Sequence, residues 1–123
     1  MSKNIREIHA FSLGEIVKPD ETKIEKTIKI TLRYVKDSGK RGLHLSVTPT
    51  QYETYPNSPV SFEKYKGYTG SSTFVHPMTR FSAKKLAEYK PSLQHLKILM
   101  EDVCARNGIE QPDITTIKQH FTL

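Results

Sequence analysis

The sequence predicts an α+β fold: an antiparallel meander sheet of about four or five strands in the first two-thirds of the chain, packed on C-terminal helices. Apolar and polar residues alternate through much of the first part, which is typical of strands with one buried face. Apolar residues recur three or four positions apart in the last third, as they do along one side of a helix. Because the chain has 123 residues, we expect a single domain spanning 1–123.

The N-terminal segment carries apolar side chains at 5–17 without a clean period. Helix and strand patterns compete there, and we favour a strand near residues 7–13 that adds to one edge of the sheet. His9, Phe11 and Leu13 would then share one face of that strand. Gly14 and the polar residues 18–21 are expected to form the loop that follows.

A β-hairpin between residues 27 and 48 is the clearest element of the sequence. Its first strand has apolar residues at even positions and its second strand at odd positions: Ile28, Ile30, Leu32 and Tyr34, then Leu43, Leu45 and Val47. The turn-like segment 37–40 between them contains Gly39, which can adopt a positive φ. These features predict two antiparallel strands that share one apolar face.

The parity of the apolar residues restricts the register of this hairpin. Opposed residue numbers must sum to an odd value, and a two-residue loop at Ser38-Gly39 makes that sum 77. Leu32 would then face Leu45, while Arg33 would face His44 on the other side of the hairpin. The second face would be polar and basic.

The chain after the hairpin is expected to form a loop and then a second hairpin. Three prolines between 49 and 59 disfavour a central strand, so we interpret this stretch as a connection. Val60 and Phe62 alternate with polar residues, and residues 72–76 carry a further apolar pair. We expect these two runs to pair around a turn at residues 67–70, with Pro77 ending the last strand.

The last third of the sequence predicts three helices. Ser82 is a plausible N-cap for a helix at 83–89, and Pro91 is expected to form the first turn of the next helix. That helix has an apolar stripe at 3–4 spacing, which we expect to cover the apolar face of the first hairpin: Leu93, Leu96, Leu99, Met100, Val103 and Cys104. Asn107-Gly108 should end it, and Asp113 should cap a final helix that buries Ile114, Ile117 and Phe121.

The bulk composition indicates a small basic protein with a net charge of +6. No apolar run approaches the roughly 18 residues of a membrane span, and residues 1–4 lack the apolar core of a signal peptide, so we expect no membrane association and no export. The single cysteine, Cys104, precludes an internal disulfide and fits a reducing compartment. We therefore expect a cytoplasmic location.

The positive charge is concentrated in two blocks. Residues 23–41 contain seven Lys and Arg against two acidic residues, and residues 64–97 contain seven against one. If both blocks lie on one surface, that surface can attract phosphates or an acidic protein. Alternatively, these lysines only keep the surface solvated and bind no acidic partner.

Motifs for metal binding or catalysis are absent from the sequence. The five histidines are scattered singly at positions 9, 44, 76, 95 and 120, without the short spacings that bring metal ligands together. Cys104 lies on the apolar stripe, where core packing explains it better than reactivity. The neighbouring Glu101 and Asp102 point about 100° apart on a helix and cannot converge on one substrate. We expect no metal, no cofactor and no enzymatic activity.

Nucleic-acid binding has more support, because aromatic residues between 52 and 74 are interleaved with lysines next to the basic hairpin. Lysine and arginine can bind phosphates while aromatic rings stack on bases. The candidate contacts are Lys29, Arg33, Lys36, Lys40, Arg41, His44, Lys64 and Lys66, with Tyr65 and Tyr68 as possible stacking residues. The structural alternative places Phe62 and Phe74 in the core, with the tyrosines covering the turn and the proline-rich loop.

The sequence thus predicts a non-enzymatic binding protein whose basic hairpin face contacts nucleic acid or another anionic partner, such as an acidic protein. The competing hypothesis is a protein-interaction module, for instance an inhibitor or adaptor encoded by a phage or other mobile element. Such a module would act through an open sheet edge or through the basic face. Homo-oligomerisation through the same edge is equally allowed.

Overall fold

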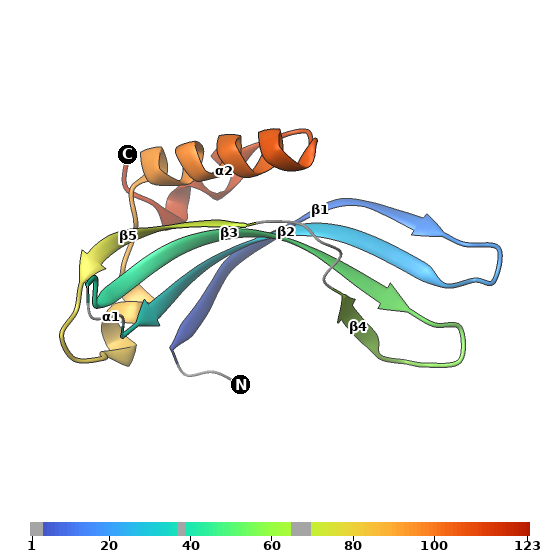
Figure 1. Cartoon of the computed structure of the whole chain (residues 1–123), viewed down its shortest axis with the longest axis horizontal. Helices are drawn as coiled ribbons and strands as arrows, with labels where there is room; N and C mark the ends of the chain where they lie inside the picture. The colour runs from blue at the N-terminus through green and yellow to red at the C-terminus, as the bar shows by residue number, and fades with distance from the viewer. Residues whose placement is uncertain (1–3, 37–38, 65–69) are drawn as a thin grey trace.

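The computed structural model describes residues 4–36, 39–64 and 70–123. Its elements, in chain order, are β1 (Ile5–Val17), β2 (Lys23–Val35), β3 (Gly42–Thr54), β4 (Ser61–Lys64), β5 (Ser71–Pro77), α1 (Ala83–Glu88), α2 (Leu93–Asn107) and the 3-10 helix η1 (Ile114–His120). The strands form one antiparallel sheet, and Figure 1 shows α2 lying across the outer side of its bend. The predicted α+β fold, with helices at the C-terminal end, is confirmed.

The β2–β3 hairpin has the predicted register. From Lys23 opposite Thr54 to Val35 opposite Gly42, every pair sums to 77. Residues Asp37 and Ser38 of the predicted turn lie outside the described part of the chain. The apolar positions of both strands form the centre of the core and are fully buried: Ile28, Ile30, Leu32, Leu43, Leu45 and Val47. Parity alone therefore assigned the faces of two strands of 13 residues each.

The predicted second hairpin is wrong, because β4 and β5 do not pair with each other. Both pair with the same edge of β3, where β5 covers residues 42–47 and β4 covers residues 51–54. The long strand β3 thus provides hydrogen-bond partners for two short strands that lie one after the other along it. Residues 67–69 of the expected turn lie outside the described part of the chain. The sheet order is β1-β2-β3-β4, with β5 beside β3.

The predicted loop at 49–59 is also wrong in its first half, because residues 49–54 continue β3. Pro49 lies between the part of β3 that pairs with β5 and the part that pairs with β4. Among the described residues, none pairs with Pro49 on that edge of β3. Proline, which has no amide hydrogen to donate, is tolerated where a strand ladder is interrupted. Only residues 55–60, which include Pro56 and Pro59, form a connection.

Strand β1 is the expected edge strand, and it is longer than predicted. It pairs with β2 from Ile5 to Val17, with irregularities between Glu7 and His9 and between Ser12 and Gly14. Gly14 belongs to this strand and not to the following loop, since it takes a φ of 131° at the second irregularity. Glycine adopts that conformation without the strain that a side chain would introduce.

The helices begin at polar caps. The hydroxyl of Ser82 accepts a hydrogen bond from the amide of Lys85 at 3.2 Å, as predicted for α1. For α2 the cap is Ser92, which accepts from the amide of Gln94 at 3.2 Å. The prediction that Pro91 forms the first helical turn is wrong, because Pro91 precedes the cap and is itself buried.

Helix α2 buries five of the six residues of its predicted stripe, whereas Leu93 is only partly buried. It packs mainly on β3 and β5, and not on both strands of the β2–β3 hairpin as predicted. Its buried residues are Leu96, Leu99, Met100, Val103 and Cys104. Gly108 ends the helix in the left-handed conformation, with φ of 64°, as expected. Asp113 caps η1, a 3-10 helix that places Ile117 and Phe121 in the core, while Ile114, which was also predicted to be buried, is only partly buried. None of the helices in the described ranges has the length and apolar character needed to span a membrane.

The end of the sheet where β1 turns into β2 and β3 turns into β4 extends past the end of α2 in Figure 1. We call this uncovered extension of the sheet the arm (residues 14–25 and 51–63). Several of its apolar side chains are exposed: Ile16, Val17, Tyr55, Val60 and Phe62. Glu53 is buried in the same region and accepts a hydrogen bond from the Tyr55 hydroxyl at 2.8 Å. The helical layer therefore covers only part of the sheet.

The burial pattern of α2 predicts a sharp contrast between two neighbouring apolar residues. Leu96 is fully buried, whereas Ile98 is 53% exposed. Leu96→Ala should lower the free energy of unfolding by about 2 to 5 kcal/mol, and Ile98→Ala should change it by less than about 0.5 kcal/mol. Urea denaturation followed by circular dichroism measures both values. Similar losses from the two substitutions would contradict the orientation of α2.

Candidate functional site

The sheet has one face packed on the helices and one face directed away from them, which we call the open face. On β2 and β3 the open face is polar and consists of Thr27, Lys29, Thr31 and Arg33 together with His44, Ser46, Thr48 and Thr50. The hydroxyl groups of Thr27 and Thr50 form a buried hydrogen bond with each other across the two strands. This hydrogen bond satisfies the two buried hydroxyl groups, although none of the described helices packs on this face.

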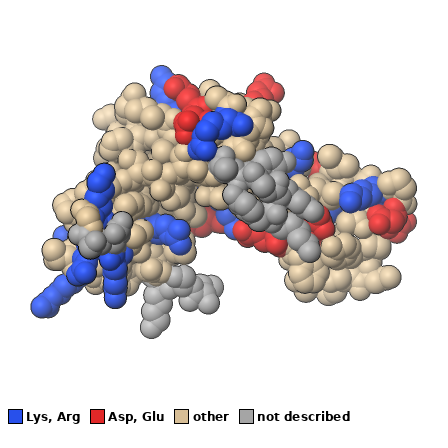
Figure 2. Space-filling model, in the orientation of Figure 1, with Lys and Arg blue, Asp and Glu red and all other residues tan. Residues whose placement is uncertain are grey.

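Basic side chains gather at the end of the sheet where β2 leads into β3. We call this group the basic end: Arg33, Lys36, Lys40, Arg41, Arg80, Lys84 and Lys85. All seven residues are exposed, and none forms an ion pair with another described residue. Figure 2 shows Lys and Arg gathered at the lower left of the molecule, where Figure 1 places α1 and the adjoining ends of the strands.

The two basic blocks of the sequence meet at this end through backbone and ring contacts. The amide of Met78 donates to the carbonyl of Arg41 at 3.2 Å, and the Tyr34 hydroxyl donates to the carbonyl of Thr79 at 3.3 Å. The rings of Tyr34 and Phe81 lie 5.4 Å apart. These contacts hold the start of α1 beside the hairpin, so that part of the second block extends the charge of the first.

Lys29 has a different environment from the basic end. Its ammonium group lies 2.9 Å from Glu63 and 3.9 Å from Glu7, and 5.2 Å from the centre of the Tyr52 ring. Burial lowers the pKa of Lys29, but hydrogen bonds to Tyr52 and Glu63 outweigh that effect and leave the pKa raised. The charge of Lys29 is therefore balanced by acidic residues within the fold, unlike the charges of the basic end.

The remaining candidates lie elsewhere or outside the described residues. Lys64 pairs through its backbone with Gln51, about 30 Å along β3 from Gly42. Tyr65, Lys66 and Tyr68 fall in the undescribed range. Of the ten residues predicted from the sequence, the structure brings five together: Arg33, Lys36, Lys40, Arg41 and His44.

Phe62 and Phe74, which the structural alternative placed in the core, are not part of it. Phe62 lies on the arm and is 44% exposed. Phe74 is half-buried, pairs with His44 across β3 and β5, and has its ring 5.4 Å from the imidazole. The sequence could have revealed this position only if β5 had been paired with β3 instead of with β4.

Residues that could hold a metal or act as nucleophiles do not converge in the described ranges. No group of three or more His, Cys, Asp and Glu there could hold a metal ion. Cys104 is buried, and burial raises the pKa of its thiol. A raised pKa keeps the sulfur protonated and disfavours attack on a substrate.

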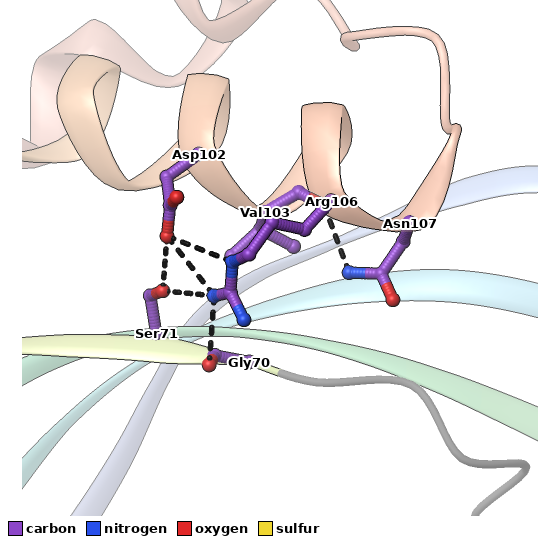
Figure 3. Close-up of polar contacts among 6 residues, drawn as sticks. All are labelled: Gly70, Ser71, Asp102, Val103, Arg106 and Asn107. Carbon is purple, nitrogen blue, oxygen red and sulfur yellow. Dashed lines mark hydrogen bonds and ion pairs between the residues drawn. The ribbon is translucent and has the colours of Figure 1, made fainter.

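Ser71, His95 and Asp102 line one depression of about 330 Å³ beside α2, a combination of residue types that also occurs in catalytic triads. Here, however, the Ser71 hydroxyl donates directly to Asp102 at 2.6 Å, whereas a triad requires an imidazole between the two. Arg106 also contacts Asp102 at 3.0 Å and donates to the carbonyl of Gly70 at 3.1 Å (Figure 3). This network ties α2 to the start of β5.

The network predicts a pH-dependent contribution to stability. Hydrogen bonds from Ser71 and Arg106 hold the pKa of Asp102 below its ordinary value. Because the folded pKa is depressed, this contribution is complete above the ordinary range of about 4 and is lost as the pH falls through the folded value. Asp102→Asn should therefore lower the melting temperature at pH 7 and have a much smaller effect near pH 2. Equal effects at the two pH values would contradict the network.

Comparisons of the chain with protein-family models, with curated proteins and with solved structures yield no match.

Proposed function

We propose that the protein is a non-enzymatic binding protein whose basic end contacts the phosphates of a nucleic acid. The observation that carries this proposal is the cluster of seven exposed basic side chains, drawn from both basic blocks, without ion pairs to other described residues. Phosphate binding releases condensed counterions, and exposed Lys and Arg side chains supply this driving force.

The distribution of charge along the sheet supports a defined binding position. The arm contains six acidic residues against two lysines, which gives it the opposite sign to the basic end. Charges separated by more than a Debye length of about 10 Å are largely screened from one another at 0.1 M salt. A polyanion is therefore attracted to one end of the protein and repelled by the other.

Salt-dependent binding tests this proposal. The dissociation constant for a labelled mixed-sequence oligonucleotide should rise steeply between ~50 and ~200 mM salt. Replacing both Lys36 and Arg41 by Gln should reduce the slope of log K against log salt by about 1.4 for a single strand or about 1.8 for a duplex, because two phosphate contacts are lost. Fluorescence anisotropy gives both quantities.

A matched control removes the same charge from the arm. Lys18 and Lys23 are exposed and lie on the arm, so replacing both by Gln changes the net charge by the same amount. This variant should keep the wild-type slope. If the two double variants weaken binding equally, net charge and not the basic end determines affinity. If wild-type protein does not bind at ~50 mM salt, the proposal is wrong.

The arm favours a second candidate function, self-association as an interaction module. Its exposed apolar side chains lie on β1, on β4 and on the connection at 55–60. Among the described strands, β1 pairs with β2 alone. Exposed apolar groups and open strand edges are the features through which sheets associate. A second copy of the chain offers the same strands and the same apolar groups, so two arms can bury them together.

Sedimentation velocity over a range of protein concentrations tests this second candidate. Wild-type protein should form dimers as its concentration rises, and the double variant Val17→Ser/Phe62→Ser should remain monomeric. Ile98→Ser is the control, because Ile98 is exposed on α2 and away from the arm. A wild-type protein that stays monomeric at every concentration would rule out self-association.

A further inference from the structure

One row of side chains crosses four strands on the open face, next to the basic end. Ile5 on β1 lies opposite Arg33 on β2, Arg33 lies opposite His44 on β3, and His44 lies opposite Phe74 on β5. With neighbouring strands about 4.8 Å apart, the row spans about 14 Å. It combines a guanidinium group, an imidazole and a phenyl ring on one surface.

The rings of this row are held in place by the sheet. The ring centres of His44 and Phe74 are 5.4 Å apart with an angle of 69° between their planes. The Nε2 atom of His44 donates a hydrogen bond to the carbonyl oxygen of Lys40 at 3.0 Å. Arg33 is exposed beside them, and its planar guanidinium can stack on an aromatic ring. The row is therefore a fixed set of flat groups with a positive charge.

We propose that this row stacks on the bases of a single-stranded nucleic acid whose phosphates contact the basic end. The inference rests on the proposed function and specifies its substrate. Aromatic and guanidinium planes bind unpaired bases without regard to sequence, because every base has a flat face. In a duplex those faces are covered by neighbouring base pairs, and the grooves admit a helix or a two-stranded ribbon, which is narrower than this row of four strands.

The neighbouring rows limit how far a strand can extend along the open face. The next row contains the carboxylate of Glu7 on β1, opposite Thr31. Its other members are short polar side chains, with Thr31 opposite Ser46 and Ser46 opposite Ser72. Beyond it lies Lys29, whose charge is balanced by Glu63. Among the described side chains of these rows, no further unbalanced cation is offered to a phosphate, so the bound strand should lie near the basic end.

A tryptophan reporter tests the stacking directly, because the chain contains no tryptophan. The fluorescence of the Phe74→Trp variant should be quenched when a single-stranded 12-mer is added. It should not be quenched by an abasic sugar-phosphate strand of the same length, since that strand offers charge but no bases. Phe62→Trp, which places the reporter on the arm, should not respond to either strand.

Affinity measurements provide an independent test. Loss of one stacked base corresponds to roughly a 5- to 150-fold weaker binding, which is the effect expected of Phe74→Leu on the single-stranded 12-mer. The same variant should change binding of the abasic strand, and of a duplex formed by the 12-mer and its complement, by less than about twofold. Phe74→Tyr keeps the ring and should retain affinity, and Phe62→Leu is the matched control on the arm. Circular dichroism verifies that each variant is folded.

The outcomes separate this inference from the proposed function. If all three nucleic-acid probes fail to bind at ~50 mM salt, both are wrong. If the probes bind but Phe74→Leu affects none of them, or affects all of them equally, the stacking row is wrong while phosphate binding stands. Tighter binding of the duplex than of the single strand would also overturn the inference.

Discussion

The structure depends on the pairing of β2 with β3. All 13 cross-strand pairs keep one register, and this register places the largest fully buried side chains of the sheet on one face. A shift by one residue would exchange the two faces and expose the core. The same register places Arg33 opposite His44, so the contact that stabilises the fold also assembles the candidate binding row.

Strand β3 has a second role, because its other edge pairs with two strands in succession. This arrangement places Phe74 beside His44 and Pro49 between the segments of β3 that pair with β5 and with β4. It also extends the sheet past α2, which produces the arm. The first half of β3 therefore belongs to the covered part of the sheet, which has the basic end. Its second half belongs to the uncovered part, which has acidic and apolar side chains.

The network of Ser71, Asp102 and Arg106 connects α2 to the start of β5. It fixes α2 over β3 and β5, and the stripe from Leu96 to Cys104 closes the core beneath it. Helix α1 is held separately, since Arg6 of β1 donates to the carbonyl groups of Leu86 and Tyr89 at 2.9 Å. The contacts between residues 78–81 and the hairpin then bring Arg80, Lys84 and Lys85 to the basic end.

The sequence by itself determined the hairpin register, the faces of β2 and β3, the stripe of α2 and the caps at Ser82, Gly108 and Asp113. These features follow from periodicity and from backbone preferences that act over a few residues. The tertiary structure decided which strands pair with the second edge of β3, because short alternating runs such as 61–64 and 71–77 fit any open edge. It also decided that Lys29 is neutralised by Glu63 and that Phe74 joins His44. These contacts join residues 34 and 30 positions apart, and no local pattern specifies such pairs.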